Sequence, residues 1–265
     1  REGRPIRKRR YAYSESFAAI AHAAYYRATG DERSAIRAKK LFEQFTRWNF
    51  TPGLMPPKFN GERPAIGMGP RMITLVTVQE LRANLNDASL DPWADRMIDE
   101  IERLFFKPEQ NVVMETVSPE GLIIDHFDGR LLNPGHAIEG AWFVMREGSE
   151  RIRPEWIELG CRMLDCMWQR GWDPEYGGIR YFCDVFDRPV QEYWHDMKFW
   201  WPHNETIIAT LLAWLLTGNV KYAKWHQQVH DWAHRAFTDR QHGEWFGYLH
   251  RDGRLSSTLK GNLWK

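Results

Sequence analysis

The chain has 265 residues and a formal net charge of +1, from 36 basic and 35 acidic side chains. This length suits one large domain or two small ones, and the 43% of hydrophobic residues is typical of a globular protein. The balanced charge argues against nucleic-acid partners and anionic membrane surfaces, because both favour a basic surplus. The one basic cluster, residues 4–10, is interpreted as a solvated turn.

Helical periodicity dominates the chain. Apolar residues recur three and four positions apart, which predicts about eight helices. Gly30 is predicted to end the first helix and Asp31 to cap the second. The predicted helices begin at Tyr13, after Asp31, near Pro70 and at Asp91, and then at Asn133, Pro154, Asp196 and Val220.

Three stretches between the helices predict short β-hairpins, at residues 112–132, 173–190 and 239–255. Two of them open with a D-x-x-x-G pattern, at Asp173 and Asp239, and each follows a pair of helices. Repeated helix pairs joined by long loops on one face predict a closed ring of helical hairpins. Because no low-complexity linker divides the chain, residues 1–265 are predicted to form a single domain.

Two His–Glu patterns carry the candidate chemistry. The first, N-P-G-H-A-I-E, sets His136 and Glu139 on one face of a helix in its first turn. The second, W-W-P-H-N-E, sets His203 and Glu205 at the head of an apolar run. An imidazole exchanges protons near neutral pH, and a neighbouring carboxylate fixes its tautomer. The pairs are predicted to converge on one pocket. The alternatives are two surface pairs that never meet and, for the second, a core histidine satisfied by a neighbour.

Aromatic residues point to a carbohydrate ligand. The chain contains 14 Trp, and indole faces stack on the C–H surfaces of sugar rings, although a large helical core also absorbs Trp. Glu15 also fits an ordinary first-turn acid favoured by the helix dipole. The predicted substrate contacts are Trp142, Trp200, Trp201, Glu15, Lys198, Glu244 and Tyr248, and Asp173, Glu175 and Lys260 are further candidates in or beyond the hairpins.

Other chemistries lack support in the sequence. H-x-x-E has no third ligand at a zinc spacing, so no metal site is predicted. There is no G-x-S-x-G nucleophile motif and no Gly-rich phosphate loop. Cys161, Cys166 and Cys183 form no C-x-x-C pair and are interpreted as reduced thiols of a cytoplasmic protein. No apolar run reaches the length that spans a membrane.

Four motifs resemble those of the N-acylglucosamine 2-epimerase family, also called renin-binding protein. The stretch KFWWPHNETIIA, residues 198–209, is similar to the family's K-x-W-W-P-H-x-E. Residues 133–143 resemble N-P-G-H-x-x-E-x-x-W-F, residues 243–249 match G-E-W-F-G-Y-L, and residues 27–30 match R-A-T-G. The matches run in order over essentially the whole chain.

This resemblance implies an all-α fold, the (α/α)6 barrel, with short β-hairpins in the loops on one face. Four helical hairpins of six are expected here, so the barrel is expected to be incomplete, truncated at both ends, with an exposed apolar seam. The resemblance implies interconversion of N-acetylglucosamine and N-acetylmannosamine through proton removal at C2. His203 matches one catalytic histidine of the family. The other lies in a C-F-H-x-P-R stretch that follows the family's K-G-x-x-x-K, here residues 260–265.

The implied protein is a cytoplasmic isomerase of amino sugars, with the segment by itself expected to be inactive. No cofactor is required, ATP is a candidate allosteric regulator, and a homodimer is expected because family members are often dimers. Three alternatives stay open. One is an aldose–ketose isomerase of the mannose type, and another is an (α/α) barrel glycosidase using Glu139 and Glu205. The third is a binding protein without catalysis.

Overall fold

The computed structural model describes residues 12–55 and 63–260, so the basic cluster at residues 4–10 lies outside the described residues. The chain divides after Ile101 into two compact units, residues 1–101 and 102–265. The single domain therefore stays a prediction, and each unit is described by itself.

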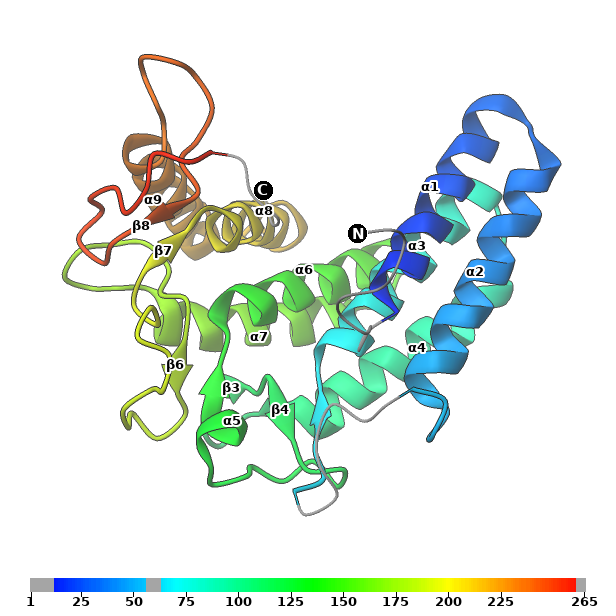
Figure 1. Cartoon of the computed structure of the whole chain (residues 1–265), viewed down its shortest axis with the longest axis horizontal. Coiled ribbons are helices and arrows are strands. Elements are labelled where there is room, and N and C mark those ends of the chain that lie inside the picture. The colour runs from blue at the N-terminus through cyan, green and yellow to red at the C-terminus, as the bar shows by residue number, and fades with distance from the viewer. Residues whose placement is uncertain (1–11, 56–62, 261–265) are drawn as a thin grey trace, which may run out of the picture. The chain divides into compact units, whose positions relative to one another are not determined.

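The first unit is built from helices. Helix α1 packs on α2 and α3, and α3 packs on α4 (Figure 1). Gly30 ends α1 as predicted, because it adopts a left-handed φ of 74° and its N–H donates to the carbonyl of Tyr26. The elements are α1 (Tyr13–Thr29), α2 (Glu32–Phe50), β1 (Ile66–Gly67), α3 (Gly69–Leu85), the 3-10 turn η1 (Ala88–Leu90) and α4 (Asp91–Glu100).

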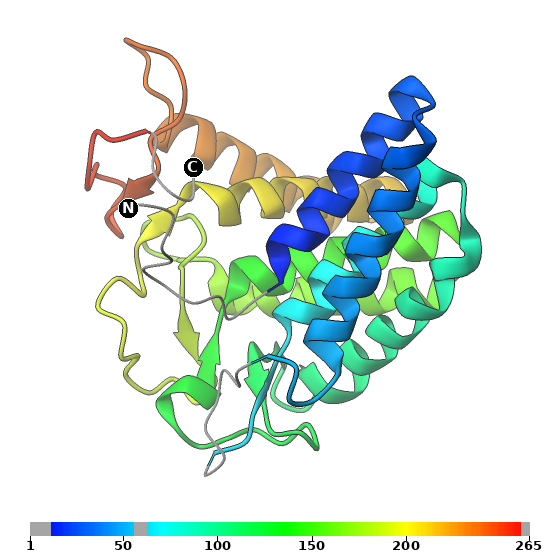
Figure 2. The same cartoon turned by 45° about the vertical axis from the view of Figure 1, so that its right-hand side comes forward.

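In the residues that the structure describes, the second unit has four long helices and several short strands. Helix α6 packs against both α7 and α8, and α8 packs against α9 (Figure 2). Following the π-helical turn η2 (Ile101–Phe105), its elements are β2 (Phe106–Lys107), β3 (Val112–Val113), β4 (Thr116–Val117), α5 (Phe127–Arg130), β5 (Leu131–Leu132), α6 (Pro134–Glu150), α7 (Pro154–Gly171), β6 (Cys183–Asp184), β7 (Lys198–Phe199), α8 (Trp200–Thr217), α9 (Val220–Ala236) and β8 (Tyr248–Leu249).

Close packing of α6 on α7 depends on a small residue. A Cβ atom on Gly160 would lie 2.6 Å from the carbonyl oxygen of Ala141, which is too close for any other residue type. The apolar faces of the two helices supply the core, with Ile138, Met145 and Leu164 fully buried. This pairing fixes the position of the first turn of α6, where the candidate site begins.

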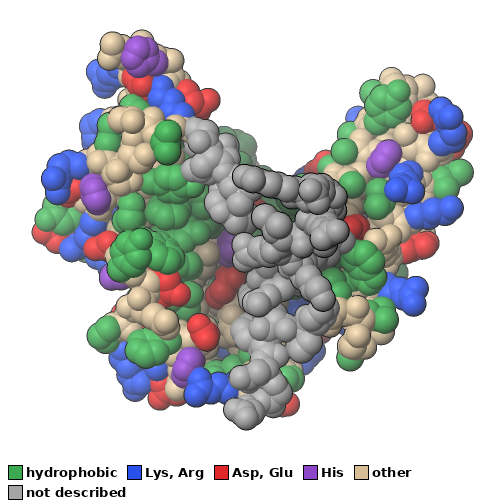
Figure 3. Space-filling view, in the orientation of Figure 1, with side chains coloured by type: hydrophobic (Ala, Val, Ile, Leu, Met, Phe, Trp, Pro, Cys, Tyr) green, Lys and Arg blue, Asp and Glu red, His purple; other side chains and the backbone are tan. Residues whose placement is uncertain are grey.

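Helix α8 starts later than predicted. Residues 198–199 form β7, which pairs antiparallel with β8, so the helix begins at Trp200 and not at Asp196. Hydrophobic side chains gather over this part of the second unit (Figure 3). Along α8, the apolar side chains of Ile208, Leu211 and Leu215 are exposed.

The first predicted hairpin, residues 112–132, is paired differently from the simple expectation, whereas local antiparallel bridges join Trp172 to Ile179 and Leu249 to Leu255. Strand β3 pairs back with β2, and β5 pairs with β6, so residues 112–132 do not form a self-contained hairpin. Residues 127–130 form the short helix α5 inside that stretch. Strand pairing is decided by partners outside the stretch, which local patterns do not reveal.

The repeated D-x-x-x-G pattern is confirmed as one repeated turn. The carboxylates of Asp173 and Asp239 each accept hydrogen bonds from the N–H groups two and three residues on. The N–H groups of Gly177 and Gly243 donate to the carbonyls of the same two Asp residues, and both glycines have φ of 72°. A lysine pairs with each carboxylate, Lys198 with Asp173 and Lys260 with Asp239.

Within residues 12–55 and 63–260, no helix is both long and apolar enough to cross a membrane. The three cysteines are free thiols, as predicted. The Cys183 thiol donates to the carbonyl of Arg170 at 3.3 Å, and burial raises its pKa to about 11, which keeps it unreactive at neutral pH.

Candidate active site

His136 is held at the start of α6. Asn133 caps the helix, and its side-chain oxygen accepts the His136 backbone N–H at 3.2 Å. The imidazole is 37% exposed, and its Nδ1 lies 3.1 Å from Oε2 of Glu115. The ring centroid of Trp201 lies 5.1 Å from that of His136. Trp201 can approach the start of α6 because residue 135 is glycine. A Cβ atom at that position would lie 2.8 Å from the indole.

Glu139 lies one turn further along α6 and faces the same site. Burial is the main cause that raises the pKa of its carboxyl group to about 7, and the negative charges of Glu205 and Glu115 add to it. His136 acts in the opposite direction, less strongly than burial or Glu205 but more strongly than Glu115. A carboxyl group with this pKa is shared between its acid and its carboxylate form near neutral pH, which suits proton transfer.

Glu205 reaches the same site from α8. The indole N–H of Trp142, on α6, donates to Glu205 Oε2 at 2.8 Å. Burial raises the pKa of Glu205, and this hydrogen bond opposes the rise. The structure therefore brings together five predicted site residues from the N-terminal parts of α6 and α8. They are His136, Glu139, Trp142, Trp201 and Glu205.

An aromatic wall extends from this cluster. Tyr181 makes an edge contact with Trp201, with ring centroids 5.9 Å apart, and stacks on Phe199 at 4.0 Å. Phe199 in turn meets the edge of Tyr248 at 4.7 Å. All four rings are half-buried, so each keeps some surface accessible to a ligand. Tyr248, a predicted substrate contact, lies at the far end of this wall.

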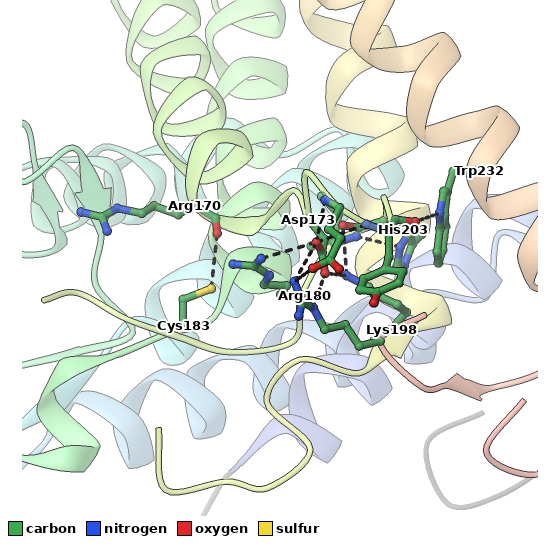
Figure 4. Close-up of polar contacts among 12 residues, drawn as sticks. Arg170, Asp173, Arg180, Cys183, Lys198, His203 and Trp232 are labelled. Atoms are coloured by element: carbon green, nitrogen blue, oxygen red, sulfur yellow. Dashed lines mark hydrogen bonds and ion pairs between the residues drawn. The ribbon is translucent and has the colours of Figure 1, made fainter. Parts of the chain in front are cut away.

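His203 contradicts its predicted role as an acid–base residue. It is fully buried, and both ring nitrogens are used by the backbone: Nδ1 donates to the Phe199 carbonyl at 2.7 Å, and Nε2 accepts the Ile179 N–H at 2.9 Å. The ring stacks on Trp232 at 4.8 Å (Figure 4). Burial lowers the pKa of His203 to about 3, so the ring stays neutral at physiological pH. The core-histidine alternative is the one observed.

Lys198 is also buried, so its predicted contact with substrate is contradicted. Its ammonium lies 3.1 Å from Asp173 Oδ2, and both side chains are fully buried (Figure 4). Burial lowers the pKa of Lys198 to about 8, against the attraction of Asp173. Hydrogen bonds from Arg251 and Lys198 outweigh the burial of Asp173 and hold the pKa of its carboxyl well below the usual range. The group ties two loops to the start of α8.

The contacts of the remaining candidates are with other parts of the structure. Trp200 packs against the core around Trp232 and Phe237. Glu244 is exposed, and its carboxylate accepts the N–H of Trp245. Among the others, Glu175 pairs with Arg251, Lys260 pairs with Asp239, and Glu15 accepts a hydrogen bond from Ser14 in α1. A substrate contact from these residues stays a prediction.

The sequence reasoning missed Glu115 and Tyr181. Glu115 stands between β3 and β4 as the single charged side chain in the run 112–117, whose other members are buried or largely buried apolar and threonine residues. A single carboxylate in a run of apolar residues is the sequence feature that could have pointed to Glu115. In the part of the chain that the structure describes, no group of three or more His, Cys, Asp or Glu side chains is placed to hold a metal ion.

A family profile described as N-acylglucosamine 2-epimerase (GlcNAc 2-epimerase) matches residues 1–265. The chain is 34% identical to the N-acylglucosamine 2-epimerase of Bos taurus, over 100% of the chain and 64% of the relative, and 33% identical to that of Homo sapiens, over 100% and 63%. The chain thus spans just under two thirds of these relatives.

Solved structures show the fold. A D-mannose isomerase superimposes with a TM-score of 0.80 and 16% identity, over 96% of this chain and 68% of that one. The cellobiose 2-epimerase of Spirochaeta thermophila DSM 6192 gives a TM-score of 0.78 and 19% identity, over 96% and 66%. Both are (α/α)6 barrels, so the fold class predicted from the sequence is confirmed.

Proposed function

Because the chain belongs to the N-acylglucosamine 2-epimerase family, we propose that the protein is a sugar 2-epimerase that interconverts N-acetylglucosamine and N-acetylmannosamine. The observation that carries the proposal is the half-exposed imidazole of His136 beside the buried carboxyl group of Glu139. A base and an acid of near-neutral pKa in one site are what proton exchange next to a carbonyl requires.

The reaction starts from the ring-opened sugar, whose C1 aldehyde makes the C2 hydrogen acidic. His136 removes this proton through Nε2, the electrons of the C2–H bond form a C1–C2 double bond, and O1 becomes an enolate oxygen. Return of a proton to the opposite face of C2 gives the epimer. The resemblance assigns the group on that face to the histidine of the C-F-H-x-P-R stretch.

Glu139 stabilises the negative charge that develops at O1. In its acid form, which its raised pKa favours, it donates a hydrogen bond to the enolate oxygen. Glu205, held by the Trp142 N–H, keeps Glu139 protonated through its own negative charge. The aromatic wall of Trp201, Tyr181, Phe199 and Tyr248 offers apolar ring faces for the sugar.

A glycosidase is the second candidate, favoured by the interaction between Glu139 and Glu205. Two carboxyl groups in one site, with the pKa of Glu139 raised so that it can act as the acid, are also what cleavage of a glycosidic bond needs. In that reaction His136 would have no proton to take from carbon. The two candidates therefore differ in whether His136 is essential.

The test incubates the full-length protein with N-acetylglucosamine in D2O and follows the proton NMR spectrum. We expect the C2 proton signal to disappear while N-acetylmannosamine grows, and we expect His136→Asn to slow exchange by at least about 100-fold. His234→Asn, an exposed histidine on α9, is the matched control. No exchange at C2 of N-acetylglucosamine, together with a ketose formed from mannose, would move the assignment to an aldose–ketose isomerase. Hydrolysis of a glycoside that survives in His136→Asn would favour the glycosidase.

A further inference from the structure

We propose that Glu115 is a positioning residue that holds His136 in the tautomer with its proton on Nδ1, leaving the basic lone pair on Nε2 for the substrate. This inference rests on the proposed function, since it names the residue that prepares the base. It is carried by the 3.1 Å separation of Glu115 Oε2 and His136 Nδ1.

The backbone around Glu115 is firmly anchored. Met114 on one side is fully buried, and its N–H donates to the Phe105 carbonyl at 2.9 Å. Thr116 on the other side is only 6% exposed and begins β4. The carboxylate therefore leaves a fixed point of the chain, and its side chain is 22% exposed. A group anchored in this way can hold a ring in one orientation.

A carboxylate can only accept hydrogen bonds, so the nitrogen facing it must carry the proton. In neutral His136 that nitrogen is Nδ1, and Nε2 becomes the proton acceptor. When Nε2 takes a proton, the negative charge of Glu115 stabilises the imidazolium. The same contact thus selects the reactive nitrogen and raises its basicity.

His203 is a histidine whose Nδ1 has no carboxylate partner, so it can be compared with His136. Its Nδ1 donates to a neutral carbonyl, that of Phe199, and the ring is fully buried. Burial there disfavours the protonated form. Two histidines at the starts of two helices therefore differ in their Nδ1 partner, and only His136 has a carboxylate in that place.

Other charged groups also face His136. Glu139 comes from α6 and Glu205 from α8, and both act on the same imidazole. Tyr181 lies near Glu115, whose charge adds to burial in raising the pKa of that phenol. Glu139 and Glu205 interact with each other, whereas Glu115 is the carboxylate in hydrogen-bond contact with His136 Nδ1.

The experiment reads the tautomer directly. Protein labelled with ¹⁵N-histidine gives long-range proton–nitrogen NMR signals for each ring, and the His136 signals are those missing from His136→Asn. We expect the Nδ1-protonated tautomer in the wild type. In Glu115→Gln and Glu115→Ala we expect a mixture of tautomers and a ring titration midpoint lower by about 0.5 to 1 pH unit. Glu120→Gln is the matched control, because Glu120 is exposed and accepts a hydrogen bond from the Ser118 hydroxyl.

Activity supplies the second readout. If the wild type exchanges the C2 proton, both Glu115 variants should lose about 10- to 100-fold in kcat with KM changed by less than about 2-fold. An unchanged tautomer and midpoint, or an unchanged kcat, would overturn the positioning role. If the wild type shows no C2 exchange, the proposed function fails by itself, and the NMR signals still decide whether Glu115 orients His136.

Discussion

The indole N–H of Trp142 on α6 donates to Oε2 of Glu205 on α8 at 2.8 Å, joining side chains 63 positions apart in the sequence. The contact holds together two helices that each contribute an acid to the candidate site. It also gives a largely buried carboxylate a donor, without which its charged form would be costly.

Trp142→Phe should reveal how much the hydrogen bond between Trp142 and Glu205 contributes to stability. We expect the free energy of unfolding to fall by about 1–3 kcal/mol at an alkaline pH that ionises Glu205, and by less at an acidic pH that protonates it, because a protonated carboxyl needs the donor less. Urea unfolding at the two pH values measures this. Trp214→Phe, at a 40% exposed position on α8, is the control. Equal losses at both pH values would contradict the assigned interaction.

Glu139→Gln should make the protein more stable in alkaline solution. The pKa of Glu139 is raised from 4.5 to about 7, so the folded state holds its proton more tightly than the unfolded chain. That advantage is complete below pH 4.5 and is lost as pH rises through 7, a change on the order of 3 kcal/mol.

In Glu139→Gln no carboxyl group is left to ionise, so the stability that the wild type loses as the pH rises is not lost in the variant. The gap in unfolding free energy between the variant and the wild type should therefore widen in favour of the variant from pH 4 to pH 8. Urea titrations across that range measure it, with the exposed α6 pair residue Glu150 changed to Gln as control. A gap that does not change with pH would show that Glu139 titrates normally.

His203→Ala should damage stability and spare chemistry. It removes a ring that satisfies the Ile179 N–H and stacks on Trp232, so we expect a loss of about 2–4 kcal/mol. The C2 exchange rate per folded molecule should stay within about 3-fold of the wild type. Thermal melting and exchange in D2O give the two numbers. A rate lost by 100-fold in folded protein would restore His203 as an acid–base residue.

Asp173→Asn tests the buried ion pair against its repeat. The change leaves the Lys198 ammonium buried without its partner, which costs about 3–5 kcal/mol. Because the pKa of Asp173 is depressed, the wild-type contribution is present above the unfolded pKa and is lost as pH falls through the folded pKa. Asp239→Asn changes the same turn where Lys260 is partly exposed, so its loss should be smaller. Comparable losses would show that burial of Lys198 is unimportant.

The helices and the repeated turn were predictable because their causes are local. The apolar spacing of residues 13–29, the glycine that follows and the proline at the start of α6 act within a few residues, and the observed bounds agree. The Asp173 and Asp239 turns likewise need only one carboxylate and a glycine of positive φ. The family motifs were also readable from the residues alone.

Which of the two histidines is exposed to a ligand was decided only by the tertiary structure. His136 and Glu139 are three residues apart and share a helix face, whereas His203 and Glu205 are two apart and point to different sides of α8. The motif set both histidines at the start of a helix, but the Asp173 turn covers His203 and gives it a backbone donor. Glu115 joins His136 from 21 positions away. Burial and partners of this kind come from contacts distant in sequence, so no local pattern contains them.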